Sequence, residues 1–180
     1  FRAWAHQDVF EQRKSEAARL QDFVDAGDLV LCEHATQDIE EVADIVERLN
    51  DEGLLPEKGA VGLDPAGVAA MVDEITSRGV TDEQLAGVPQ GYRLNGAIKG
   101  FERRLKARTA RHQGAALMDW VVGNAKAEQK GNAVLITKQA AGTAKIAPLC
   151  AGFNAVELMG RNPEGRRINL GDFLANAVAA

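Results

Sequence analysis

Residues 60–67 read Ala60-Val-Gly-Leu-Asp-Pro-Ala-Gly67, and they join a short apolar run to a helix-like segment that extends from Ala66 to Arg78. Apolar runs bounded in this way are typical of buried strands. Asp64 followed by Pro65 is the signature of a helix start, with the acid at the N-cap and the proline at the first helical position. Asp64 therefore lies where a strand ends, which is the edge at which open α/β sheets bind ligands. A capping role alone is the alternative interpretation.

The segments before this stretch alternate in the same way. Phe1–His6 has the pattern of the end of a strand, and Leu29–Cys32 is a second short apolar run. Helices are expected from Asp8 to about Ala26 and from Thr36 or Asp38 to Gly53, because apolar residues recur there at helical spacing. Strands that alternate with helices predict an α/β domain with some parallel pairing.

The segments after it predict further helices and a β-hairpin. Helices are expected over residues 95–108, with Ile98, Phe101 and Leu105 inward, over residues 115–123, and from Pro148 to about Met159. The strand-like runs 125–128 and 133–137 flank Gln129-Lys-Gly-Asn132. Turn residues between two such runs predict a β-hairpin near 125–137.

The net charge of −5 is unevenly divided along the chain. Residues 1–90 hold 7 Lys/Arg and 20 Asp/Glu, a net charge of −13, whereas residues 91–145 hold 11 Lys/Arg and 3 Asp/Glu, a net charge of +8. This asymmetry predicts a basic face on an acidic body, and a polyanion such as nucleic acid is its natural partner because neutralised phosphates release counterions. A solvated charged helix is the alternative. The expected phosphate contacts are Lys99, Arg103, Arg104, Lys130, Lys138 and Lys145.

Several classes of protein are excluded or disfavoured. The sequence has no G-x-x-x-x-G-K-[ST] phosphate loop, no G-x-G-x-x-G and no G-x-S-x-G. No apolar run approaches the roughly 18 residues that cross a bilayer, so no membrane partner is expected. Cys32 and Cys150 form no Cys-x-x-Cys pair, which fits a reducing cytoplasm. The chain begins at Phe1 rather than Met, which suggests a fragment or a processed product.

Ala147 does not fit the helix start that Pro148 predicts. Pro148 has the pattern of a first helical position, so the residue before it should be a capping Asp, Ser, Thr or Asn, yet it is Ala147. A strand-end carboxylate, a basic half and a second position that lacks an acid suit phosphodiester cleavage with two metal ions. Ligands that offer oxygen alone favour Mg²⁺ or Mn²⁺.

An ordered series of motifs resembles the C-terminal nuclease domain of the large terminase subunit of tailed phages and prophages. The resemblance covers about residues 1–163 and leaves 164–180 as a tail or short helix. The motifs are Gly62-Leu-Asp-Pro-Ala-Gly67, Gln90-Gly-Tyr-Arg-Leu94, Leu117-Met118, Trp120-Val-Val-Gly-Asn124, Gly131-Asn-Ala-Val-Leu-Ile-Thr-Lys138, Lys145-Ile-Ala-Pro-Leu149 and Phe153-Asn-Ala155.

The resemblance implies a ribonuclease H-like mixed sheet flanked by helices, and an endonuclease that cuts concatemeric double-stranded DNA with two Mg²⁺ or Mn²⁺ ions. Asp64 matches a metal ligand of that family, and Ala147 stands where the family has a metal-binding aspartate. A third family aspartate lies on a strand upstream of anything that resembles Phe1–His6, so N-terminal strands are expected to be missing. The chain is therefore expected to be a weak or inactive nuclease.

The same resemblance implies partners and a location. They are the terminase ATPase domain, the small terminase subunit and the portal protein, in the cytoplasm of a host bacterium. The alternatives are a non-catalytic DNA-binding or assembly module from a degenerate prophage terminase, and an unrelated α/β protein that binds a small ligand. Whether Ala147 is an inactivating substitution or the product of a decayed prophage gene stays open at this point.

Overall fold

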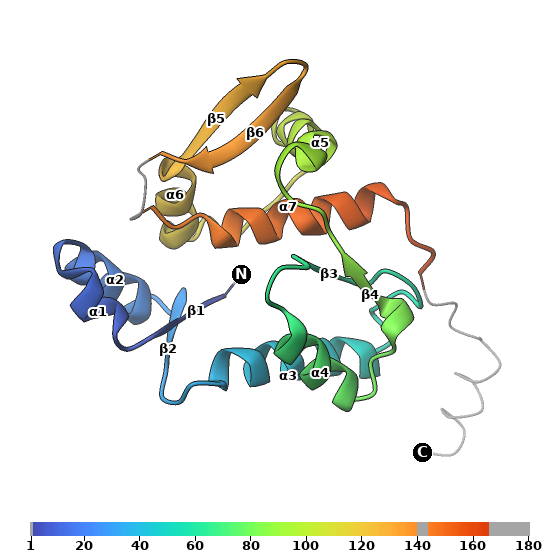
Figure 1. Cartoon of the computed structure of the whole chain (residues 1–180), viewed down its shortest axis with the longest axis horizontal. Helices are drawn as coiled ribbons and strands as arrows, with labels where there is room; N and C mark the ends of the chain where they lie inside the picture. Colours follow the sequence, from blue (N-terminus) through green and yellow to red (C-terminus); the bar gives the residue numbers. More distant parts are fainter. Residues whose placement is uncertain (1, 140–143, 166–180) are drawn as a thin grey trace.

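The computed structural model describes residues 2–139 and 144–165 of the chain, and it confirms a mixed α/β fold (Figure 1). The strands are β1 (Ala3–His6), β2 (Leu29–Cys32), β3 (Val61–Leu63), β4 (Leu85–Gly87), β5 (Ala125–Lys130) and β6 (Ala133–Lys138). The α-helices are α1 (Val9–Gln12), α2 (Ala17–Asp25), α3 (Gln37–Asp51), α4 (Ala69–Ser77), α5 (Asn95–Lys106), α6 (Ala116–Gly123) and α7 (Ala147–Gly160). Short 3-10 turns are η1 (Lys14–Glu16), η2 (Asp82–Gln84) and η3 (Gly91–Leu94).

The strands pair in both orientations. β1 pairs with β2 and β3 with β4 in parallel, whereas β5 and β6 form the predicted antiparallel hairpin around a turn at Gly131 and Asn132. The two parallel pairs confirm the parallel pairing predicted from the alternation of strands and helices. Within the described residues, the three strand pairs are separate two-stranded sheets rather than one continuous sheet.

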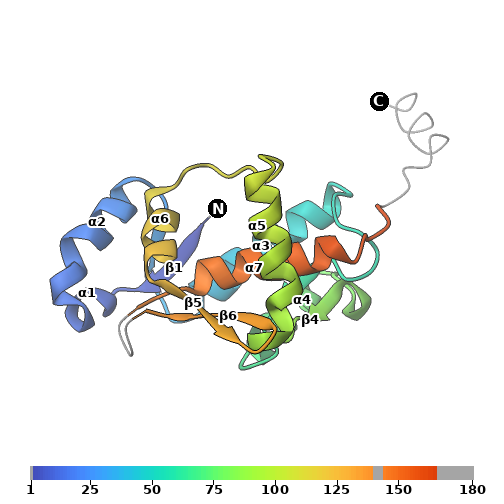
Figure 2. The ribbon, with the colours of Figure 1, turned by 90° about the horizontal axis from the view of Figure 1, so that it is seen from above.

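Helix α7 lies at the centre of the molecule, with α5, α6 and the hairpin on one side and the β3–β4 pair on the other (Figures 1 and 2). Its buried residues Leu149, Phe153 and Leu158 belong to the larger hydrophobic core. Phe153 meets Phe101 of α5 edge to face, with ring centroids 6.0 Å apart. Burial of apolar surface against α5, α6 and β3 makes this helix one of the elements that join the acidic and basic halves of the chain.

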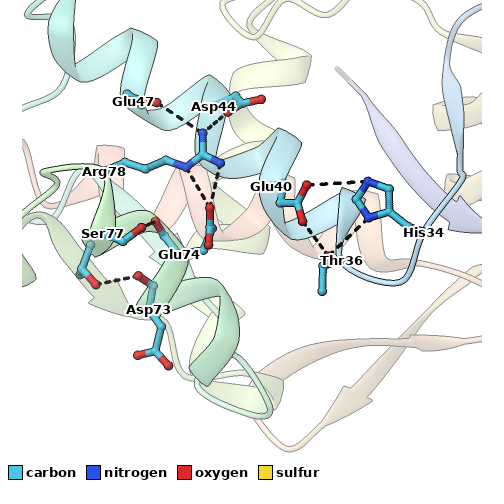
Figure 3. Close-up of polar contacts among 10 residues, drawn as sticks. His34, Thr36, Glu40, Asp44, Glu47, Asp73, Glu74, Ser77 and Arg78 are labelled. Atoms are coloured by element: carbon cyan, nitrogen blue, oxygen red, sulfur yellow. Dashed lines mark hydrogen bonds and ion pairs between the residues drawn. The ribbon is translucent and has the colours of Figure 1, made fainter.

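A second core joins α3 and α4, and a polar cluster closes it at the surface (Figure 3). The guanidinium of Arg78 donates to Glu74 at 2.8 and 3.1 Å, to Glu47 at 3.3 Å and to Asp44. Arg78 is largely buried while these carboxylates are more exposed. The cluster satisfies the charge of one arginine with carboxylates from both helices, so it serves to hold α3 against α4.

Some predicted helices have different limits in the structure. The helix expected from Asp8 to Ala26 is broken into α1, η1 and α2, because the backbone leaves the helical region at Arg13, with φ −129° and ψ 49°. Leu105 was predicted to be buried, but it is 44% exposed because the last turn of α5 extends beyond the core. No helix in residues 2–139 and 144–165 is long and apolar enough to cross a membrane. The predicted tail lies outside the described residues from position 166 onward.

Candidate functional site

Asp64 follows β3 directly and is exposed, as the strand-end prediction requires. Its Oδ1 accepts a hydrogen bond from the Ala66 backbone N–H at 3.1 Å, which closes a local turn. The prediction that Asp64 caps the next helix is wrong, because α4 begins at Ala69 and Val68 occupies the N-cap position. Gly67, with φ +74°, delays the helix by several residues. The Asp64 carboxylate is therefore held at the sheet edge and is not used as a helix cap.

The thiol of Cys150, in the first turn of α7, has a raised pKa. Burial raises the pKa of this thiol, the negative charge of Asp64 raises it further, and the ammonium of Lys138 lowers it. Side chains from the ends of β3 and β6 thus lie close enough to Cys150 to act on its charge. Cys150 follows Ala147 by three residues, so the two positions share one face of α7.

Ala147 is the first residue of α7, and the N-cap position belongs to Ile146. The predicted capping role of position 147 is therefore wrong by one residue, because the Ile146 carbonyl already accepts the Cys150 backbone N–H at 3.1 Å. Ala147 is exposed and lines a cavity of about 440 Å³ together with Lys145 and with His6 and Asp8 from the β1 side. An acid at position 147 would therefore line this cavity.

The described residues do not fit a site for two divalent cations. Among residues 2–139 and 144–165, no group of three or more His, Cys, Asp or Glu side chains is placed to hold a metal ion. Asp8, the acid nearest to Ala147 in the cavity, accepts a hydrogen bond from the Gln12 side chain at 2.6 Å. Because two-metal sites need carboxylates from separate elements, Asp64 alone would hold an ion weakly.

The predicted basic residues lie on α5, the hairpin and the segment before α7, and all six are exposed. None of the six forms an ion pair with a described residue, whereas Lys106 pairs with Glu102 and Lys126 pairs with Glu128. Lys99 donates to the Asn132 carbonyl at 3.2 Å, which places α5 beside the hairpin turn and near Lys130. Helical spacing puts Arg103 on the same flank of α5 as Lys99 and puts Arg104 on the opposite flank.

Asn124 brings Lys138 and Lys145 together. Its carbonyl accepts the Gln139 backbone N–H at 2.8 Å, and its side chain donates to the Lys145 carbonyl at 3.2 Å. The structure thus places Lys138, Lys145 and Ala147 near the start of α7, and it places Lys99 and Lys130 at the far end of the hairpin. Asn124 and Cys150 were not predicted to be site residues, although the spacing of Cys150 from Ala147 indicates a shared helix face.

No protein-family model matches the sequence, and no curated protein matches it. The structure is similar to the crystal structure of the HK97 bacteriophage large terminase. The TM-score is 0.66 at 20% sequence identity, over 85% of this chain and 32% of the terminase. The chain therefore has a terminase-like fold, and it spans about a third of the length of that protein.

Proposed function

We propose that the chain is the nuclease domain of a phage or prophage large terminase, which acts on double-stranded DNA during genome packaging. The observation that carries the proposal is the position of Asp64, which follows β3 at the carboxyl end of a parallel strand pair, while β3 packs directly against α7, the helix that begins at Ala147. The overall fold supports the proposal, since it is similar to that of a solved phage large terminase. An acid at position 147 would give the site a carboxylate from a second element.

With Ala147 in place of an acid, the chain is a weak or inactive endonuclease. An intact site would bind two Mg²⁺ or Mn²⁺ ions, which supply charge stabilisation for the attacking and leaving oxygens. Among the described residues, Asp64 belongs to no group of three or more possible metal ligands, so no catalytic step is assigned to metal in this chain. DNA, by contrast, would meet the exposed and unpaired cations of α5 and the hairpin. The ATPase domain, the small subunit and the portal protein are the further partners that a terminase function implies.

A second candidate function is a non-catalytic DNA-binding or assembly module from a degenerate prophage terminase. The same missing acids favour it, because a protein that acts through contacts alone needs no metal site. Both candidates use the basic surface. Only the first candidate predicts that cleavage returns when the acid at position 147 is restored.

The deciding experiment compares the chain with its Ala147→Asp variant, alone and in a longer chain that carries the upstream terminase strands. An exposed alanine on the same helix, changed by Ala155→Asp, is the matched control. Ala147→Asp should create a Mg²⁺-dependent rise in melting temperature, because an ion stabilises only the form that binds it. It should also increase plasmid nicking, whereas Ala155→Asp should do neither.

Without metal, the change should alter stability little. An acid in the first turn of α7 gains roughly 0.3–1 kcal/mol from the helix dipole, and repulsion from Asp64 offsets part of this. If Ala147→Asp in the longer chain changes neither the Mg²⁺-dependent melting nor the nicking, position 147 is outside the metal site. DNA binding without restored cleavage would then favour the non-catalytic module.

A further inference from the structure

Tyr92 and Arg93 project from the 3-10 turn η3. Tyr92 is 64% exposed, and it is the one tyrosine of the chain. The Arg93 guanidinium lies over the Tyr92 ring, 5.9 Å from its centroid, which is within the range of a cation–π contact. Because a single exposed ring is common on protein surfaces, its meaning depends on how the ring is held and on what lies around it.

The backbone around this ring is anchored on both sides. Leu94 is buried in the larger core. On the other side, the Gln90 amide donates to the Val88 carbonyl and to Oδ1 of the buried Asn154, both at 2.9 Å. Gly91 turns the chain outward with φ +72°. A ring on such a fixed turn binds a partner with little further loss of conformational freedom.

The turn leaves the same sheet edge as Asp64. Strands β3 and β4 are parallel, and the Leu63 carbonyl accepts the Val88 backbone N–H at 2.8 Å, just beyond the paired residues. A Cβ on Gly87 would lie 3.9 Å from Cβ of Pro65. Asp64 and the segment that leads to Tyr92 therefore start from adjacent strand ends and both pass α7.

The surroundings of the ring suit a polyanion. Between Glu83 and Glu102 the sequence contains no Asp or Glu, while Arg93 and Lys99 are exposed. η3 contacts both α5 and β6, and Asn95 at the start of α5 accepts the Val134 backbone N–H at 2.9 Å. The turn that carries the ring thus contacts two of the elements that carry the exposed cations, α5 and β6.

We propose that Tyr92, with Arg93 beside it, stacks on an unpaired base of DNA whose backbone lies along the basic surface. Backbone phosphates need cations but give no role to an exposed ring, whereas every base offers a face for aromatic stacking. The proposal rests on the proposed function in taking DNA as the ligand. It adds that the surface distinguishes DNA with an unpaired end or opening from closed duplex.

The experiment measures the affinity of the chain at low salt for a blunt duplex and for the same duplex with a short single-stranded overhang. The wild-type chain should prefer the overhang. Tyr92→Ala should lower affinity for the overhang by roughly 5- to 150-fold and leave the blunt duplex nearly unchanged, since stacking contributes on that scale per base. Tyr92→Phe should keep the preference because it keeps the ring.

The control is Leu54→Ala, which removes a side chain with the same 64% exposure from the acidic half and should alter neither affinity. Equal binding of the two DNAs by the wild-type chain, or an overhang preference that survives Tyr92→Ala, overturns the stacking role while the proposed function stands. If the wild-type chain binds neither DNA at low salt, the stacking role and the DNA-binding function both fail. Portal or ATPase-domain binding that depends on Tyr92, with no DNA effect, would assign the ring to a protein contact and overturn the proposal.

Discussion

Gly62 and Leu158 bring β3 and α7 into direct contact. A Cβ added to Gly62 would lie 2.9 Å from Leu158 Cδ1 and 3.1 Å from a methyl group of Val88. Strand and helix therefore pack at a distance that leaves no room for another methyl group. The strand that carries Asp64 is positioned against α7 by this contact, two residues before the carboxylate.

Gly62→Ala should destabilise the protein by about 1–3 kcal/mol, because an extra methyl group in a filled core forces its neighbours to move. Gly96→Ala is the matched control, since a Cβ there meets nothing within 4 Å. That change lies in α5 and should stabilise the protein by roughly 0.5–1 kcal/mol. Urea denaturation of both variants measures the difference. Equal effects of the two changes would contradict the close contact.

The ionisation of Cys150 should report the charges around the start of α7. Because the Asp64 carboxylate raises the pKa of this thiol, Asp64→Asn should lower the pKa and speed alkylation at mildly alkaline pH. Lys138→Ala should raise the pKa and slow the reaction. The measurement uses a Cys32→Ser background, so that Cys150 is the remaining thiol. Unchanged rates in both variants would place these side chains too far from Cys150.

The pKa of the Cys150 thiol should also report whether Mn²⁺ binds at Asp64. If Asp64 binds the ion, Mn²⁺ should lower the pKa of Cys150 in the wild-type chain and have no such effect after Asp64→Asn. A response that survives Asp64→Asn would mean that the ion binds elsewhere.

Glu41 should make stability depend on pH in the acidic range. Hydrogen bonds from the Gln37 side chain and from the Trp4 indole, at 2.7 and 2.8 Å, lower the pKa of this carboxyl from its ordinary value of 4.5. The folded state then binds this proton less readily than the unfolded state does. The stabilisation is present above pH 4.5 and is lost as the pH falls through the lower folded value. Glu41→Gln should therefore reduce stability near neutral pH and have less effect in acid, as thermal melts across this range would reveal.

DNA binding should depend on salt through the basic surface. The logarithm of the affinity should fall with the logarithm of the salt concentration at about −0.9 per neutralised phosphate. Replacing Lys130 and Lys138 by Ala should flatten that slope by roughly one to two units. The matched control replaces Lys14 and Lys58, which are exposed in the acidic half, and should leave the slope unchanged. A slope that is the same in both double variants would remove these two lysines from the interface.

Strong local patterns predicted much of the fold. The apolar runs at Leu29–Cys32 and Val61–Leu63 are strands, and the turn chemistry at Gly131 produced the hairpin. Strand β4 was not predicted, because Leu85-Ala-Gly87 contains no β-branched or aromatic residue to mark it as a strand. The capping box of Thr81 and Gln84, just before it, marks the 3-10 turn η2.

Helix starts were harder to predict, because a proline, with or without an acid before it, is compatible with a turn as well as with the first residue of a helix. At Asp64 the side chain closes a turn with Ala66, and at Pro148 the helix begins one residue earlier than the usual pattern. Of the candidate site, the sequence indicated the strand-end position of Asp64. The packing of β3 against α7 and the link from the end of β6 to Lys145 depend on contacts between distant segments, which no local pattern encodes.

The central place of α7 also has a consequence for synthesis of the chain on the ribosome. Leu149, Phe153 and Leu158 complete the larger core, yet they are among the last described residues to be translated. Until they emerge, the apolar faces of α5, α6 and β3 lack their cover. A chain that stops before Ala147 should therefore bind chaperones and aggregate. During translation, the apolar core faces stay exposed to solvent until α7 has been synthesised and packs against them.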